Sequence, residues 1–295
     1  MFLKRLLMTG GGLGAAALLV KAAEKVESVG GEKVGKAEKT RRDIEIARAG
    51  IVGQPPAFWD SNWDFRDPAA LVTKTQLNAA RQKGGEEEVK KLLKTKKPSA
   101  SRYIYLIRHG QYKYEGEDHH QVLSELGEAQ ARATGKRLKT SGIVFQRLVN
   151  STLTRATQTA DLIAAEMEPR QIIQRSSDSL LEEGSPYPVD PPVPHWTPPM
   201  KDVVTEGTRI EAAFRRYFHR ASPDTEKDEH EILVCHGNVT RYFMMRALQL
   251  PPEAWLRLSK PHGSITVLVI RPNGHVQLWS FGDAGHMPPE MISFR

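Results

Sequence analysis

The stretch SRYIYLIRHG, residues 101–110, decides the fold that this sequence predicts. Its first part, 101–107, is rich in Tyr and Ile and follows a segment of Lys and Pro, so it predicts a buried strand. Arg108, His109 and Gly110 then stand where that strand ends, which is where open α/β sheets bind ligands. A neutral imidazole can accept a phosphoryl group, and a guanidinium can hydrogen bond to two phosphate oxygens. We expect Gly110 to leave room for a phosphate beside the backbone.

Helices and strands alternate along the chain after this stretch. The pattern predicts helices at 126–140, 154–166, 210–220 and 239–248, and strands at 147–150, 231–235, 264–271 and 275–281. Pro272-Asn273-Gly274 between the last two strands is a hairpin signal. The sequence therefore predicts an α/β fold with a mostly parallel central sheet, an antiparallel edge strand and helices on both faces. The segment 184–199 holds seven prolines and is expected to be a long ordered or lid-like loop.

The net charge of +7 is confined to one part of the chain. The first 98 residues contain 19 basic and 12 acidic residues, whereas the remainder contains 23 of each. A nucleic-acid-binding module needs a basic face on its folded part, so we expect no nucleic-acid partner. The basic N-terminal part instead suits an anionic membrane surface or an import leader.

The N-terminus begins with a short apolar segment. Residues 6–20 are uncharged, and as a helix they reach about 22 Å, less than the roughly 30 Å of a hydrocarbon core. Residues 1–3 and the flanking lysine and arginine stems can extend this reach. We interpret residues 1–22 as a membrane anchor or targeting segment, and a cleaved secretory signal or mitochondrial leader stays open. Residues 23–57 are predicted to be a charged linker.

The segment 58–68 stands out because Trp59 and Trp63 lie in a polar region. Exposed aromatic side chains of this kind favour contact with another surface, and docking on the chain's own domain is the equal alternative. Residues 69–98 predict a further linker with a short surface helix at 86–97.

Three more residues extend the phosphate-binding pattern. Arg155 lies near the start of a predicted helix, where free N–H groups favour anions, although a solvated arginine is the alternative. His236 follows the strand 231–235 and precedes a glycine, as His109 does. Cys235 should point to the opposite face from His236, so we expect a core cysteine and not a Cys–His dyad. Glu183, at the start of the proline-rich loop, could protonate a leaving oxygen.

These elements occur together in the order that is typical of one family. The elements are Arg108-His109-Gly110, 123–127 with Gln130-Ala131, 151–160 with Arg155, Glu183-Gly184 and His236-Gly237-Asn238. The chain thereby resembles the histidine phosphatase (phosphoglycerate mutase-like) superfamily from residue 99 to about residue 283. Residues 59–64, 190–196 and 263–266 resemble a branch of that superfamily, the membrane-anchored mitochondrial serine/threonine protein phosphatases.

The resemblance implies that residues 99–295 are a catalytic domain with a C-terminal tail. His109 would attack phosphorus and form a phosphohistidine, and Arg108, Arg155 and His236 would bind the phosphate oxygens. Glu183, directly before the glycine, would protonate the leaving oxygen. The resemblance implies neither a metal nor a cofactor, because arginines and histidines supply the positive charge.

The resemblance also implies partners and a location. The substrates would be phosphorylated proteins, and the chain would be tethered to a mitochondrial membrane, the outer one. Trp59, Asp60, Asn62, Trp63 and Asp64 would join subunits into a homo-oligomer that supports activity. Two alternatives stay open: a mutase or small-molecule phosphatase on the same fold, and a membrane scaffold with incidental activity.

Overall fold

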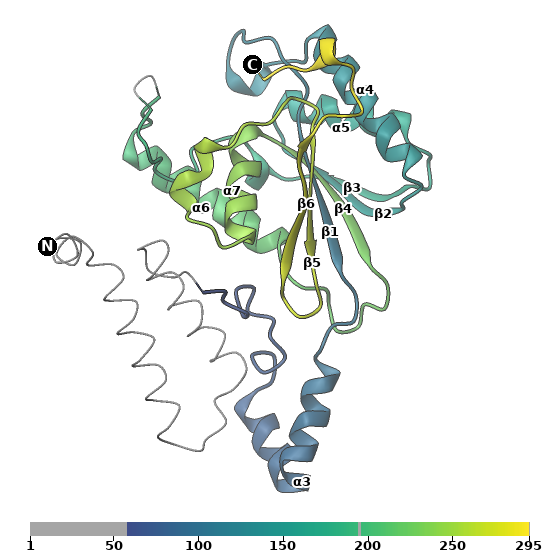
Figure 1. Cartoon of the computed structure of the whole chain (residues 1–295), viewed down its shortest axis with the longest axis vertical. Helices are drawn as coiled ribbons and strands as arrows, with labels where there is room; N and C mark the ends of the chain where they lie inside the picture. The colour runs from purple at the N-terminus through teal and green to yellow at the C-terminus, as the bar shows by residue number, and fades with distance from the viewer. Residues whose placement is uncertain (1–57, 194–195, 295) are drawn as a thin grey trace, which may run out of the picture. The chain divides into compact units, whose positions relative to one another are not determined.

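The computed structural model describes residues 58–193 and 196–294 (Figure 1). The chain divides into two compact units after Asp60, and the unit that begins at Ser61 carries the sheet and the candidate site. The predicted anchor 1–22 and the charged linker 23–57 lie outside the described residues. Among the described residues, none of the helices combines the length and the apolar character that crossing a membrane requires.

A mixed sheet forms the centre of this unit. In the described ranges its strands are β1 (Arg102–Arg108), β2 (Phe145–Asn150), β3 (Ile172–Ser177), β4 (Glu229–Cys235), β5 (Ile265–Ile270) and β6 (Val276–Asp283). They lie in the order β3-β2-β4-β1-β5-β6. The first four are parallel, β5 is antiparallel to β1, and β6 is antiparallel to β5. The predicted α/β class with an antiparallel edge is therefore confirmed.

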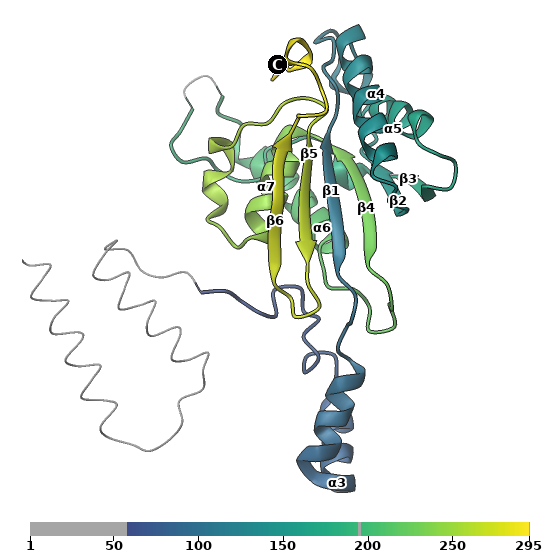
Figure 2. The same cartoon turned by 45° about the vertical axis from the view of Figure 1, so that its right-hand side comes forward.

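Helices cover both faces of the sheet. The principal ones are α4 (Glu125–Thr140), α5 (Thr154–Glu166), α6 (Met200–Tyr217) and α7 (Gly237–Ala247). In Figure 1, α4 and α5 lie on one side of the strands and α6 and α7 on the other, and Figure 2 shows the same separation from another direction. Consecutive residues of β1, Leu106 and Ile107, are both fully buried. Because neighbouring strand residues point to opposite faces, this burial requires a core on each face.

The two cores are built from different side chains. One contains Ile107, Ile232 and Val234 of the central strands together with residues of α4 and α5. In the other, three phenylalanines of α6, α7 and the residue after α6 pack on one another: Phe214, Phe218 and Phe243. Burial of such large apolar side chains stabilises the fold by roughly 1.5–3 kcal/mol each.

The structure corrects several predicted boundaries. The helix predicted at 210–220 is α6, which begins earlier than predicted, at Met200 directly after the proline-rich loop. The strand β3 was not predicted, since it is an edge strand with only two apolar residues at its start. The helix predicted at 86–97 is the second half of α3 (Lys74–Thr95), which is kinked at Gly84 and Gly85.

Short 3₁₀ helices complete the unit. They are η1 (Asp118–His120), η2 (Ser179–Leu181), η3 (Pro252–Arg257) and η4 (Pro289–Met291). The first two flank the site described below, η3 packs near α7, and η4 belongs to the C-terminal tail.

Trp63 and Asp64 are buried within the chain's own domain. The indole Nε1 of Trp63 donates to the carbonyl oxygen of Gly274 at 2.8 Å, and its ring lies 5.9 Å from that of Phe214. Asp64 forms a buried ion pair with Arg220 at 2.6 Å. These contacts are what we expected if Trp63 and Asp64 dock on the chain's own domain. Their role in oligomerisation stays a prediction.

Candidate active site

The ends of β1 and β4 bring His109 and His236 together. These strands are parallel neighbours in which Arg108 is paired with Cys235, and the backbone N–H of His109 donates to the carbonyl oxygen of Cys235 at 3.0 Å. The two imidazole rings have centroids 5.0 Å apart. The structure thus places both predicted histidines at one edge of the sheet, as strand topology requires.

His109 has the tautomer that a nucleophile needs. Its Nδ1 lies 2.8 Å from the carbonyl oxygen of Gly110, and since a carbonyl only accepts, Nδ1 carries the proton. The lone pair is then on Nε2. Burial, together with the neighbouring His236 and the positive charges of Arg108 and Arg155, holds the pKa of His109 well below its usual range. The ring is therefore neutral, and it is able to attack an electrophile.

His236 is the N-cap residue directly before helix α7 and is fully buried. Its Nε2 lies 2.7 Å from the hydroxyl oxygen of Ser151, while its Nδ1 has no hydrogen-bond partner in the described part of the chain. Burial and the nearby arginines Arg155, Arg209 and Arg108 hold the pKa of His236 far below its usual range. A second neutral imidazole with one unpaired nitrogen therefore lies beside the first.

Arg108 is partly buried and has no carboxylate directly on its guanidinium. Its terminal nitrogens donate to the carbonyl oxygens of Lys260 at 2.7 Å and Phe294 at 3.2 Å, and its Nε has no partner among the residues described. Burial lowers its pKa to about 10, and Glu183 partly opposes this shift. A desolvated cation that is hydrogen bonded only to neutral groups favours the binding of an anion.

Arg155 is buried and not solvated, which excludes the alternative considered for it. It lies at the start of α5, 2 % exposed, and its guanidinium stacks over Tyr112 with 4.9 Å to the ring centroid. One terminal nitrogen pairs with the carboxylate of Asp118 in η1 at 2.9 Å. Its Nε is buried and unpartnered within the described ranges. Asp118 itself is half exposed, so this pair can open toward solvent.

Glu183 and Glu182 differ in their surroundings. The carboxylate of Glu183 accepts from the backbone N–H groups of Asn238 at 3.3 Å and Gly184 at 3.2 Å. Glu182 instead accepts from the hydroxyl of Thr152. Burial raises the pKa of Glu183, although the two N–H groups and Arg108 act in the opposite direction. The raised pKa favours the protonated form of Glu183, which is the form that a proton donor needs.

A third histidine, His262, was not predicted. Its ring centroid lies 5.5 Å from that of His109, and the residue is fully buried. It precedes β5, whereas the two histidines that were predicted were found because they follow strands. Because β5 is antiparallel to β1, its amino end lies at the same edge as the carboxyl ends of β1 and β4. The predicted hairpin was a signal that could have identified it.

Lys260 adds a further buried cation that was not predicted. It is fully buried, and its ammonium has no hydrogen-bond partner among the residues that the structure describes. Burial lowers its pKa to about 7, with Arg108 and Arg241 acting in the same direction, and Cys235 and Glu183 opposing them.

Gly110 has a role in helix packing that was not expected. A Cβ atom at this position would lie 2.3 Å from the carbonyl oxygen of Gly127, so the absence of a side chain allows α4 to approach β1. The glycine that faces the site is Gly237, where a Cβ would lie 3.7 Å from both Arg108 Nε and Glu183 Oε2. Helix packing by itself requires glycine at position 110, and the expectation that Gly110 makes room for phosphate stays a prediction.

Cys235 lies in the core, as predicted. It is fully buried, its sulfur lies 3.3 Å from the hydroxyl oxygen of Thr240, and burial raises the pKa of its thiol. A buried thiol with a raised pKa is a poor nucleophile.

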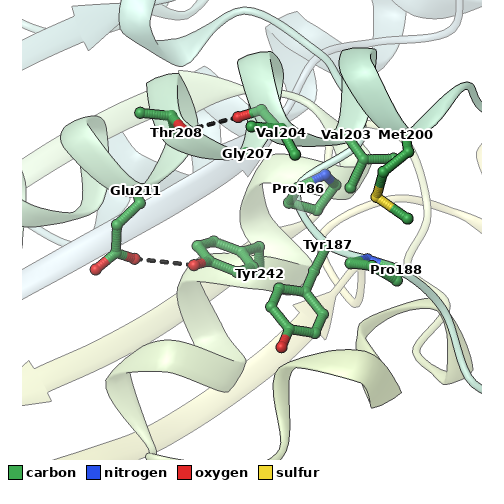
Figure 3. A pocket seen from close by; sticks show the side chains of 10 residues that line it. All are labelled: Pro186, Tyr187, Pro188, Met200, Val203, Val204, Gly207, Thr208, Glu211 and Tyr242. Carbon is green, nitrogen blue, oxygen red and sulfur yellow. Dashed lines mark hydrogen bonds between the residues drawn. The ribbon is translucent and has the colours of Figure 1, made fainter.

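An apolar cavity of about 430 Å³ lies between the proline-rich loop and helices α6 and α7 (Figure 3). Its walls include Pro186, Tyr187, Met200 and Val203. None of the predicted site residues lines it, and its one carboxylate, Glu211, is hydrogen bonded to Tyr242 at 2.9 Å. Phosphoryl chemistry needs cations and a nucleophile, so the candidate site for such chemistry is the cluster around His109 and not this cavity.

The chain is similar to known proteins over most of its length. The sequence pattern of the histidine phosphatase superfamily (branch 1) matches residues 104–183 and 190–281. The chain is 47 % identical over 298 residues to the mitochondrial serine/threonine-protein phosphatase PGAM5 of Xenopus laevis, covering 99 % of both chains. It is 44 % identical over 281 residues to the human protein of that name, covering 95 % of this chain and 94 % of that one.

Solved structures give a weaker likeness. A phosphoglycerate mutase from Plasmodium falciparum is 30 % identical, with a TM-score of 0.46, and covers 67 % of this chain and all of its own. The sequence match extends over more than half of the chain and includes all five residues predicted for the site. The chain belongs to the histidine phosphatase superfamily, branch 1.

Proposed function

We propose that this chain is a serine/threonine protein phosphatase that hydrolyses phosphate monoesters through a phosphohistidine on His109. The observation that carries the proposal is the free Nε2 lone pair of a neutral, buried His109 beside cations with unpaired nitrogens. The relatives named as serine/threonine-protein phosphatases support protein substrates.

In the first step, His109 Nε2 attacks phosphorus in line with the ester oxygen. The P–N bond forms as the P–O bond to the serine or threonine breaks, and the proton of Glu183 moves to the leaving oxygen. Arg108, Arg155 and His236 hydrogen bond to the other phosphate oxygens, where negative charge is held in the transition state. The raised pKa of Glu183 keeps a proton available for this step.

In the second step, water attacks the phosphohistidine. Glu183, now a carboxylate, accepts a proton from the water as the P–N bond breaks, and inorganic phosphate leaves. The sequence of steps returns Glu183 to its acid form and His109 to its neutral form. No step requires a redox partner.

The tether and the assembly are part of the same proposal. Residues 1–22 would anchor the chain to a mitochondrial membrane, the outer one, and residues 23–57 would link that anchor to the catalytic domain 99–295. The mitochondrial names of the relatives support the organelle. The segment 58–68 would join subunits, with 69–98 as the linker after it. Because Trp63 is part of the domain core, Trp59→Ala is the cleaner test, and we expect a smaller particle in sedimentation with an unchanged melting temperature.

The activity is tested by offering phosphoserine and phosphothreonine peptides and, separately, phosphoglycerates. We expect phosphate release from the peptides, abolished in His109→Ala with the melting temperature retained. Turnover of phosphoglycerates alone would support the mutase or small-molecule alternative. In cells that lack the chain, full rescue by His109→Ala would support a scaffold role.

The pH dependence tests the role of Glu183. Since its pKa is raised and its acid form is needed, the rate of phosphoryl transfer to His109 should fall as the pH rises through that pKa. Glu183→Gln should lower this rate by roughly 10²- to 10⁴-fold and remove that limb of the profile. An unchanged profile in Glu183→Gln would assign the proton to another group.

A further inference from the structure

The backbone between η3 and β5 holds His262 against the nucleophile. Beyond the last pair of β1 and β5, Arg108 N–H still donates to the carbonyl oxygen of Ser264 at 3.3 Å. The N–H of Gly263 donates to the carbonyl oxygens of Arg108 at 3.0 Å and His109 at 3.3 Å. The pairing that fixes the position of His109 therefore fixes that of His262 as well, and the ring separation of 5.5 Å follows from it.

A chain of hydrogen bonds leads from the backbone to Nδ1 of His262. The backbone N–H of Gln111 donates to Oε1 of Gln130 at 2.8 Å, so the amide nitrogen of Gln130 is the group that faces Ser293 at 2.9 Å. That nitrogen must donate, so the Ser293 oxygen accepts there and its own proton can be donated to His262 Nδ1, 3.0 Å away. When Nδ1 accepts in this way, the neutral ring carries its proton on Nε2, and this tautomer is part of the proposal below.

The Nε2 of His262 is buried and has no hydrogen-bond partner in the part of the chain that the structure describes. It shares this condition with Nδ1 of His236 and Nε of Arg108 and Arg155, which the proposed function assigns to phosphate oxygens. Burial and the neighbouring Arg108 lower the pKa of His262 to about 3, so the ring is neutral at physiological pH. An unpaired buried donor is costly and favours a bound acceptor.

We propose that His262 is a third phosphoryl-binding histidine, whose Nε2–H donates to an oxygen of the group transferred to His109. Ser293 is the positioning residue that keeps His262 in this tautomer. The inference rests on the proposed function, since it concerns the same site. It adds a residue at the amino end of β5 and gives the C-terminal tail a defined contribution to the chemistry.

The direct test uses the full, otherwise unmodified chain with ¹⁵N-labelled histidine. Long-range ¹H–¹⁵N spectra should show His262 protonated on Nε2 and neutral at pH 6, and orthovanadate should shift that nitrogen resonance. His262 protonated on Nδ1, or a resonance that orthovanadate leaves unmoved, would overturn the proposal. This measurement needs no turnover, so it remains decisive if the chain hydrolyses no phosphopeptide and the proposed function fails.

Two matched variants test the same donor through kinetics. His262→Leu removes the Nε2–H, and we expect kcat/KM to fall about 10²-fold and the Kd for orthovanadate to rise at least tenfold. His262→Gln places an amide N–H near the same point and should recover most of both losses, whereas a merely structural role would not distinguish them in this way. Full activity of a folded His262→Leu would reject the inference and leave the proposed function intact.

Ser293→Ala tests the positioning role. Loss of the hydroxyl should leave His262 in a mixture of tautomers and lower kcat by roughly 3- to 10-fold with KM little changed. The same spectra would report the mixture directly. A single Nε2-protonated species in Ser293→Ala would exclude Ser293 as the residue that sets the tautomer.

Discussion

The two ends of strand β1 each carry an arginine, Arg102 fully buried and Arg108 partly buried, and their surroundings differ. Arg102, at the start, pairs with the carboxylates of Glu231 at 2.7 Å and Glu229 at 3.1 Å, and it also donates to two backbone carbonyls. Arg108, at the end, donates only to backbone carbonyls and keeps an unpartnered Nε, as far as the described residues show. Both are arginines of the same strand in the same sheet.

The difference separates a structural cation, Arg102, from the cation that we propose binds phosphate, Arg108. At Arg102 the charges are neutralised: burial alone would raise the pKa of Glu231, but Arg102 and Arg147 hold it below its usual value. The charge of Arg108 has no carboxylate in direct contact, and two further cations, Arg155 and Lys260, lie close enough to interact with it. An uncompensated buried cation is costly, and binding of a phosphate removes that cost.

The largest expected effect comes from removing each arginine in turn. Arg102→Met leaves Glu231 buried without its main partner and should lower the free energy of unfolding by about 3–5 kcal/mol. Arg108→Met removes a desolvated cation and should change it by less than about 1 kcal/mol, while kcat/KM falls about 10³-fold. Chemical denaturation and phosphopeptide kinetics measure both. Equal destabilisation by the two substitutions would break the comparison.

The second effect concerns how the active-site end keeps its geometry without ion pairs. Gly110→Ala forces its Cβ onto the backbone of Gly127 and should destabilise the protein by about 3 kcal/mol. Gly237→Ala meets only ordinary contacts, so stability should hold while the methyl group between Arg108 and Glu183 weakens orthovanadate binding. Thermal unfolding with titration calorimetry distinguishes the two. Tolerance of Gly110→Ala would show that α4 can move away from β1.

The third effect is a gain in stability. Lys260 has a folded-state pKa of about 7, below its unfolded value, so it destabilises the fold fully below pH 7 and progressively less as the pH rises toward 10.5. Lys260→Met should therefore stabilise the protein by roughly 1–3 kcal/mol at pH 6. The gain should shrink between pH 7 and pH 10 in urea unfolding series. A gain that is independent of pH would mean that Lys260 is not a buried titrating cation.

The smallest effect concerns Arg155, which is intermediate between Arg102 and Arg108 because it pairs with a single, half-exposed carboxylate. Its partner Asp118 is 55 % exposed, so Asp118→Asn should change stability by less than about 1 kcal/mol. The freed guanidinium should bind inorganic phosphate roughly 2- to 5-fold more tightly, as calorimetry would show. Weaker phosphate binding in this variant would instead mean that Asp118 is needed to orient Arg155.

Much of this arrangement was predictable from the sequence, for physical reasons. Parallel strands that end at one edge bring His109 and His236 together, and the hairpin at 272–274 identified the antiparallel strands. A search restricted to residues that follow strands could not find His262 and Lys260. Because β5 runs antiparallel to β1, the residues that it places at the site edge of the sheet are those before the strand. The edge strand β3 was not predicted because its residues are mostly exposed and show no alternation of apolar and polar side chains.

The role of Gly110 was beyond sequence reasoning for another reason. Both phosphate binding and close helix packing require a residue without a side chain, and only coordinates show which neighbour a Cβ would meet. Trp63 is similar, because an aromatic residue in a polar segment fits an external surface and an internal dock equally well. Its hydrogen bond to Gly274, 211 residues away, is a tertiary contact that local pattern cannot reveal.

The central claim is that the uncompensated end of β1 makes His109 the phosphoryl acceptor. Rapid mixing of the chain with a radiolabelled phosphoserine peptide, followed by quenching within the first turnover, tests it most directly. We predict a transient acid-labile, base-stable label, at most one per chain and located on His109, that is absent in His109→Ala. Hydrolysis of the peptide at full rate with no label on His109 would contradict the account.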